Sequence, residues 1–145
     1  MSEVWRLFRA TVHRQPMQGV EEALAVENRG LEGCIHGRPG SGRQVLLMDM
    51  EALARLGLEP GMVKENITTQ GVALYELSPG QRLGIGESVL EVTMPCEPCR
   101  LMDEIRAGLR QKLRGQRGML CRVVQGGWIR RGNRIEVLEL MRVGR

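Results

Sequence analysis

The chain has 145 residues, of which 42% are hydrophobic and 26% charged, the proportions of an ordinary globular domain that can bury its own core. The formal net charge is +4, and the sequence contains no run of about 18 apolar residues, which excludes a membrane-spanning helix of the usual kind. Because the first residues also lack the apolar core of a secretion signal, we expect a single cytoplasmic domain over residues 1–145.

Short strands separated by glycine and proline dominate the predicted elements. Residues 20–27 fit a strand or a helix equally well, and residues 50–56 predict a short helix that ends at Gly57. Alternating or continuous apolar patterns predict strands in the following order: residues 4–13, 44–48, 82–85, 88–93, 119–124 and 134–140. Between the first strands, glycine and proline are dense over residues 30–42, which favours tight turns and a backbone that can approach a ligand closely.

One longer helix is predicted from Cys99 to Leu113. Leu101, Ile105, Leu109 and Leu113 follow at four-residue steps, so they share one helical face. Acidic residues come first in this segment and basic residues follow, the order that the helix dipole favours. Together with six or seven short strands, this predicts a mainly β fold, a β-barrel or sandwich with short peripheral helices.

The tetrad Cys96-Glu97-Pro98-Cys99 precedes that predicted helix. A thiol at a helix N-terminus beside Arg100 is favoured as a thiolate, so the sequence points to Cys99 as a nucleophile or a metal ligand. The alternative is that both cysteines are small buried apolar groups. We expect reduced thiols, because a chain of this length does not need disulfides.

Positive charge is concentrated towards the end of the chain. Residues 100–145 carry twelve basic and four acidic groups, a net charge of +8, which leaves −4 on residues 1–99. This distribution predicts an anionic partner or ligand; the alternative is a basic face exposed to solvent. Nucleic acid is the less suitable partner, because aromatic residues for base stacking are few and no known DNA-binding spacing occurs.

Several motifs together resemble the MOSC domain, named for the C-terminal part of molybdenum cofactor sulfurases. They occur in the family's order over roughly residues 5–140, and the chain is similar to the small stand-alone bacterial members. The motifs are residues 30–37 (GLEGCIHG), 43–47 (RQVLL), 64–71 (KENITTQG), 77–86 (LSPGQRLGIG), 89–93 (VLEVT) through Pro98-Cys99, 117–119 (RGM) and 126–130 (GGWIR).

The resemblance implies a β-barrel that binds the molybdenum cofactor, molybdopterin, with Cys99 as the cysteine that carries persulfide sulfur or ligates molybdenum. It implies a sulfurtransferase or a molybdenum-dependent reductase of N-hydroxylated compounds, if the chain is an enzyme. Its expected partners are the anionic pterin, a sulfur donor such as a cysteine desulfurase, and an electron-transfer partner for a reductase. Pyridoxal phosphate is not expected in this domain alone, and neither is a membrane.

Within this resemblance, His36 matches the family pattern, whereas Cys34 stands where the family usually has aspartate. For the cofactor we expect His36 to orient the ligand, and Arg43, Arg117 or a further arginine such as Arg130 to bind its phosphate. Asn66 could bind the pterin edge through its amide; the alternative is that Asn66 holds a backbone turn, and that each arginine faces solvent.

Two alternatives follow from the cysteines. The first is a structural zinc site formed by Cys34, His36, Cys96 and Cys99, a Cys₃His set. The second is a dithiol redox pair between Cys96 and Cys99, although the surrounding sequence lacks a thioredoxin-like βαβ pattern.

Overall fold

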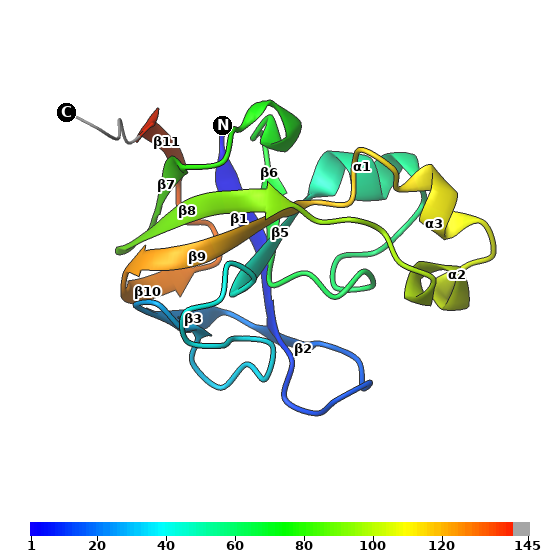
Figure 1. Ribbon diagram of the computed structural model, residues 1–145, viewed down its shortest axis with the longest axis horizontal. Coiled ribbons are helices and arrows are strands. Elements are labelled where there is room, and N and C mark those ends of the chain that lie inside the picture. Colours follow the sequence, from blue (N-terminus) through cyan, green and yellow to red (C-terminus); the bar gives the residue numbers. More distant parts are fainter. Residues whose placement is uncertain (141–145) are drawn as a thin grey trace.

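The computed structural model describes residues 1–140 (Figure 1). Eleven strands occur in this part of the chain: β1 (Glu3–Arg9), β2 (Gln18–Val20), β3 (Glu22–Val26), β4 (Gly30–Leu31), β5 (Val45–Asp49), β6 (Ile67–Gln70), β7 (Gln81–Ile85), β8 (Ser88–Pro95), β9 (Met119–Gln125), β10 (Gly127–Arg130) and β11 (Ile135–Leu140). The helices are short: α1 (Met50–Arg55), the 3₁₀ turn η1 (Leu74–Glu76), α2 (Leu101–Ile105) and α3 (Leu109–Lys112).

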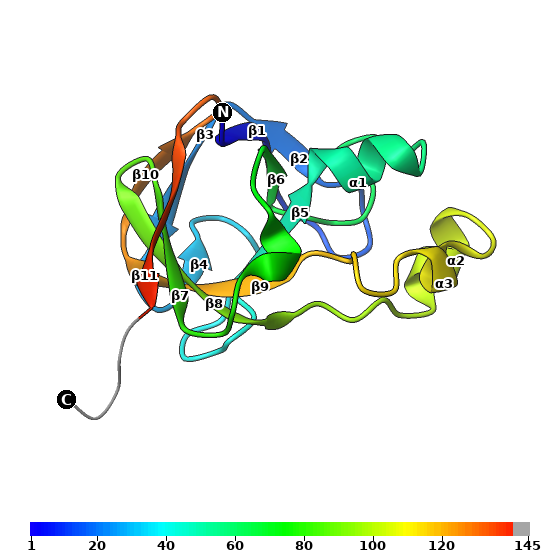
Figure 2. The same cartoon turned by 90° about the horizontal axis from the view of Figure 1, so that it is seen from above.

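The predicted mainly β class is confirmed, and the ambiguous segment at residues 20–27 is extended chain in β3. Eight strands form one sheet in the order β11-β7-β8-β9-β5-β6-β1-β2, and β10-β3-β4 form a second. The strands curl around a common interior (Figure 2). The sheets are not joined into a closed ladder, however. Between β1 and β11 the described residues form only an isolated bridge, from Glu3 to Arg134, the residue before β11, so the expected barrel is not confirmed.

Two hydrophobic clusters lie on opposite sides of β5. All five residues of this strand are buried, because a different hydrophobic cluster packs against each of its two faces. Leu47 points into the main core, to which both sheets contribute. Met48 belongs instead to a second cluster with residues of α1, α2 and α3. The helices therefore cover the outer face of the sheet, and in Figure 1 they form a layer beside β5 and β6. None of the described helices is long and apolar enough to cross a membrane.

The single helix predicted over residues 99–113 is wrong in its continuity. The segment forms α2 and α3, separated by Arg106, which has an extended backbone, and Gly108, which has φ +82°. Leu109 and Leu113 are buried as the periodicity predicted, but Leu101 is 52% exposed.

Tertiary contacts explain the break. The Arg106 guanidinium donates to the backbone carbonyls of Leu56 and Gly57, just beyond α1. Leu56 is the C-cap of α1 and Gly57 follows it, so Arg106 binds the chain just after the end of that helix. Arg106 makes these contacts from the extended backbone position that ends α2.

Candidate functional site

A pocket of about 380 Å³ lies between the glycine-rich loop after β4 and the ends of β1, β5 and β9. We call it the His36 pocket. Its lining residues come from four separate stretches of the chain: His13, Ile35, His36, Arg38, Ser41, Arg43, Gln44, Leu46, Asn66 and Leu120. The structure thus brings together His36, Arg43 and Asn66, three of the residues proposed from the sequence.

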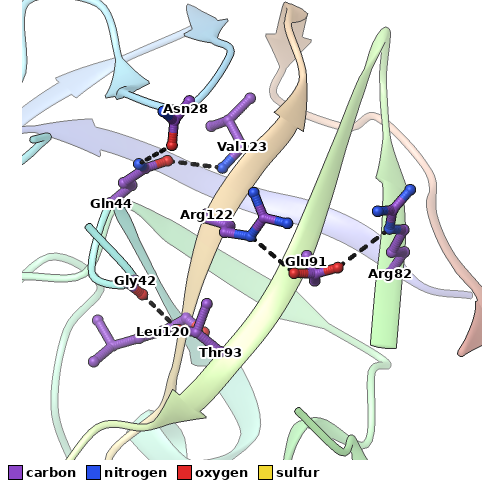
Figure 3. A network of polar contacts seen from close by, with 9 residues as sticks. All are labelled: Asn28, Gly42, Gln44, Arg82, Glu91, Thr93, Leu120, Arg122 and Val123. Carbon is purple, nitrogen blue, oxygen red and sulfur yellow. Dashed lines mark hydrogen bonds and ion pairs between the residues drawn. The ribbon is translucent and has the colours of Figure 1, made fainter. Parts of the chain in front are cut away.

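Polar contacts to β8 and β9 hold the loop that forms this pocket (Figure 3). The Gln44 side chain donates to Asn28 at 3.3 Å and accepts from the Val123 amide at 2.9 Å. On the other side of the loop, the Thr93 hydroxyl hydrogen-bonds the Gly42 carbonyl. A glycine is also required here, because a Cβ at Gly37 would lie 2.8 Å from a backbone oxygen. The loop is therefore a fixed part of the fold.

The lining is cationic. Arg38 and Arg43 are exposed at this pocket, and no acidic side chain is among the lining residues that the structure describes. The pKa of His36 lies below its ordinary value, chiefly because burial disfavours the charged imidazolium and then because Lys64 and His13 repel it. A neutral imidazole in the same pocket as two guanidinium groups is suited to an anionic ligand, since it can either donate or accept a hydrogen bond.

Asn66 lines the pocket, but its amide is already engaged. The side-chain oxygen accepts from the Leu46 amide at 2.9 Å, and the nitrogen contacts the Phe8 carbonyl at 3.3 Å and Cys34 Sγ at 3.4 Å. Asn66 is also only 2% exposed. These contacts support the alternative reading, in which Asn66 ties β1 and β5 together beneath the pocket.

Arg117 lies elsewhere. It lines a second pocket of about 260 Å³, which we call the Arg117 pocket, together with Tyr75, Leu77, Pro79, Pro95, Cys96, Glu97, Gly115, Gly118 and Met119. Cys96 packs against Leu46 and Leu120, and these two leucines line the His36 pocket. A small apolar cluster thus separates the two pockets. Arg130 lies in neither pocket; it pairs with Glu22 and Glu87.

The Cys99 thiol is exposed, in the segment that connects β8 to α2. It is not among the described lining residues of either pocket. The sequence predicted that the dipole of a long helix would favour the Cys99 thiolate. The helix α2 has only five residues and begins at Leu101, so its dipole gives little support to that prediction. The solvent-accessible thiol remains the chemically relevant feature of this position.

The described residues give no support to the zinc alternative. No group of three or more His, Cys, Asp or Glu side chains in residues 1–140 is arranged to hold a metal ion. Cys34 is buried, and its sulfur instead accepts from the amide of Ala10 and from Asn66, both at 3.4 Å. Cys34, Cys96, Cys99 and Cys121 are all free, and the dithiol pair of Cys96 with Cys99 stays an untested prediction.

Sequence reasoning did not identify His13, Arg38 or Ser41 as lining residues. Arg38 and Ser41 lie within the glycine-rich stretch that was expected to approach a ligand, so their place in that loop was a usable signal. His13 follows β1 and reaches the pocket only because the chain folds back after that strand. No local pattern indicates that contact.

The sequence pattern of the MOSC domain matches residues 35–136. The chain therefore belongs to the MOSC domain family, whose members are associated with molybdenum cofactor binding or sulfur transfer. The resemblance inferred from the motifs is confirmed. No curated protein matches the chain significantly.

Solved structures of small proteins share the fold. The YuaD protein from Bacillus subtilis is 18% identical and superposes with a TM-score of 0.78 over 94% of this chain and 96% of its own. YiiM from Geobacillus stearothermophilus is 18% identical with a TM-score of 0.75, over 96% of this chain and 76% of its own. YiiM from Escherichia coli is 21% identical with a TM-score of 0.70, over 97% and 69%.

Proposed function

We propose that this chain binds the molybdenum cofactor through the His36 pocket and carries sulfur on Cys99 in the cytoplasm. The observation that carries the proposal is the convergence of His36 and Arg43 with Arg38 and His13 in one pocket. The family association of MOSC domains with this cofactor supports it.

The residues present fit the anionic part of the cofactor. Molybdopterin carries a phosphate, and two guanidinium groups beside a serine hydroxyl supply the donors that a phosphate prefers. When bound, the cofactor supplies a molybdenum centre held by its dithiolene. Arg38 and Arg43 would bind the phosphate, and the neutral imidazole of His36 would hydrogen-bond the ligand.

Cys99 supports a sulfur-carrier role more directly than a metal-ligand role. An exposed thiol can react with a partner protein, whereas ligation would require Cys99 to reach a pocket that it does not line. As a thiolate, Cys99 attacks the terminal sulfur of a donor persulfide. The new S–S bond forms as the donor's S–S bond breaks, and the donor leaves as a thiolate, so no separate oxidant is needed. A cysteine desulfurase is a donor of this kind.

The cofactor arm is tested by purifying the full chain from cells that make molybdopterin and measuring pterin fluorescence and molybdenum content. Arg43→Gln should lower cofactor occupancy about tenfold, because a charged hydrogen bond to phosphate is lost. Arg29→Gln is the matched control: Arg29 is exposed on the neighbouring turn and does not line the pocket. Equal occupancy in the two variants would reject the pocket as the cofactor site.

The sulfur arm uses the same preparations. After incubation with a persulfide-loaded desulfurase, mass spectrometry should find one added sulfur atom on Cys99, and Cys99→Ser should remove it. Cys121 serves as the internal control, because this thiol is fully buried and burial raises its pKa. Sulfur on other cysteines, with Cys99 unmodified, would contradict the carrier role.

A further inference from the structure

We propose that the Arg117 pocket binds a small tetrahedral oxyanion such as phosphate or sulfate, at a site separate from the His36 pocket. This inference does not depend on the molybdenum cofactor.

Arg117 is a buried cation whose hydrogen bonds are incomplete. The side chain is 6% exposed, and Nη2 donates to the Val63 carbonyl at 2.7 Å. The other two nitrogens, Nε and Nη1, are buried and have no hydrogen-bond partner in the described structure. Guanidinium is always charged, and leaving its donors unpaired in the interior is costly. A partner that the protein itself does not supply would remove that cost.

The carboxylates around Arg117 do not provide this partner. Asp49 is engaged by the Ala52 amide at 3.1 Å and by the Tyr75 hydroxyl at 2.7 Å. Glu65 is close enough for the Arg117 charge to act on its pKa, but the two residues form no ion pair among the described contacts. Burial dominates at Glu65 and raises its pKa, which favours a neutral carboxyl group. No ion pair among the described residues therefore partners the Arg117 guanidinium.

The space beside Arg117 suits an oxyanion. The pocket has a volume of about 260 Å³ and extends to Tyr75, Cys96 and Gly118, which is ample for a group of five heavy atoms. The unpartnered Nε and Nη1 lie on different edges of the guanidinium, and each edge is shared with Nη2, so an oxygen of a phosphate or sulfate can accept from Nε–H or from Nη1–H. Glu97 is the acidic residue among the described lining. Its exposed carboxylate would weaken, but not prevent, anion binding.

The first experiment titrates the cofactor-free full chain with inorganic phosphate and with sulfate, using calorimetry and the ¹H–¹⁵N signal of the Arg117 Nε–H. Saturable binding with a shift of this signal is expected. Arg117→Gln should weaken binding at least about tenfold, whereas Arg114→Gln, an exposed neighbour, should not. Binding that is kept in Arg117→Gln but lost in Arg43→Gln would place the anion in the His36 pocket and overturn the proposal.

A second variant keeps the test valid if Arg117→Gln fails to fold. Glu97→Gln removes the negative charge from the pocket lining at an exposed position, so it should raise phosphate affinity several-fold. Glu104→Gln, exposed on α2, should leave the affinity unchanged. If the Arg117 Nε–H signal does not respond to saturating phosphate or sulfate, Arg117 has only a structural role, such as its hydrogen bond to the Val63 carbonyl, and the proposal is overturned.

The same titration on protein that carries bound pterin distinguishes two sources of the anion, a free oxyanion and the phosphate group of the cofactor. If the site takes a free oxyanion, added phosphate should still shift the Arg117 signal in this preparation. A signal already shifted by the pterin, with no further response, would identify the cofactor's phosphate as the occupant and would overturn a separate site.

Discussion

At the scale of single residues, Cys34 stands where the resemblance to the family led us to expect aspartate. Its sulfur accepts from two N–H groups, those of Ala10 and Asn66. These contacts link the end of β1 to the residue beneath the His36 pocket. The cysteine is therefore structural, and its link to the pocket is indirect.

Replacing this sulfur should be costly. Cys34→Ala leaves the buried Ala10 amide without its acceptor, so we expect a loss of about 1–3 kcal/mol in the free energy of unfolding. Urea denaturation measures this loss. Cys99→Ala, at an exposed thiol, should change stability by less than about 0.5 kcal/mol. Equal effects of the two substitutions would contradict a structural role for Cys34.

At the scale of elements, the break between α2 and α3 is the main difference from the sequence prediction. Four-residue periodicity correctly indicates that Leu109 and Leu113 are buried, but it is wrong for the exposed Leu101. It also does not register the carbonyl groups beyond α1 to which Arg106 donates. The glycine at position 108 then allows the left-handed turn that starts α3.

The substitution Gly108→Ala distinguishes one continuous helix over residues 99–113, as predicted from the sequence, from the two short helices of the structure. In a continuous helix the substitution would stabilise the protein by about 1 kcal/mol. In the observed turn, alanine at φ +82° is strained, although nothing lies within 4 Å of the added Cβ. We therefore expect a loss of about 1–2 kcal/mol, measured as a lower urea midpoint. A higher midpoint would indicate an unbroken helix.

Strand pairing also brings oppositely charged side chains of different elements together as ion pairs. On the outer face of β7, β8 and β9, Glu91 lies between Arg82 and Arg122, at 3.3 Å and 2.8 Å respectively (Figure 3). Arg130 and Arg131 likewise pair with acidic residues from the first part of the chain, Glu22, Glu87 and Glu21.

At the scale of the whole molecule, these ion pairs weaken the prediction that the basic residues of the C-terminal third bind an anionic partner. Several of its arginines neutralise acidic partners, and Arg142 and Arg145 lie outside the described residues. The guanidinium groups of the His36 pocket belong instead to Arg38 and Arg43, within the part of the chain that is acidic overall. An anionic ligand remains the expectation, but different residues support it.

The buried Glu65 should make the stability of the whole fold depend on pH. Its pKa is raised above the ordinary 4.5, chiefly by burial, so the folded state holds the proton more tightly than the unfolded chain. This contribution is complete below pH 4.5 and is lost as the pH rises through the folded-state pKa.

Glu65→Gln isolates this effect, because the neutral amide does not titrate. The wild-type chain should lose stability relative to the variant as the pH rises above 4.5, by at most about 1.4 kcal/mol per pH unit. Urea denaturation of both proteins between pH 4 and pH 8 measures this difference. A difference that stays constant across the range would mean that Glu65 ionises as freely as in the unfolded chain.

The sequence by itself determined the family, the mainly β class and the local elements. Side-chain alternation and glycine turns follow from neighbouring residues, so most strands were predicted to within a few positions; short strands such as β6 and β10, with four residues each, were too brief to recognise. Of the four residues that it proposed for the cofactor, His36, Arg43 and Asn66 line one pocket, and Arg117 does not.

Only the tertiary structure decided which candidate residues share a pocket, which are exposed and which already have hydrogen-bond partners. It added Arg38 and His13 to the His36 pocket, placed Arg117 in a separate pocket, engaged the Asn66 amide in the backbone, and left Cys99 exposed outside both. The physical reason is that such contacts join residues far apart in the chain, where solvent exclusion and hydrogen-bond competition depend on packing, whereas periodicity reports only the surroundings of each residue along its own element.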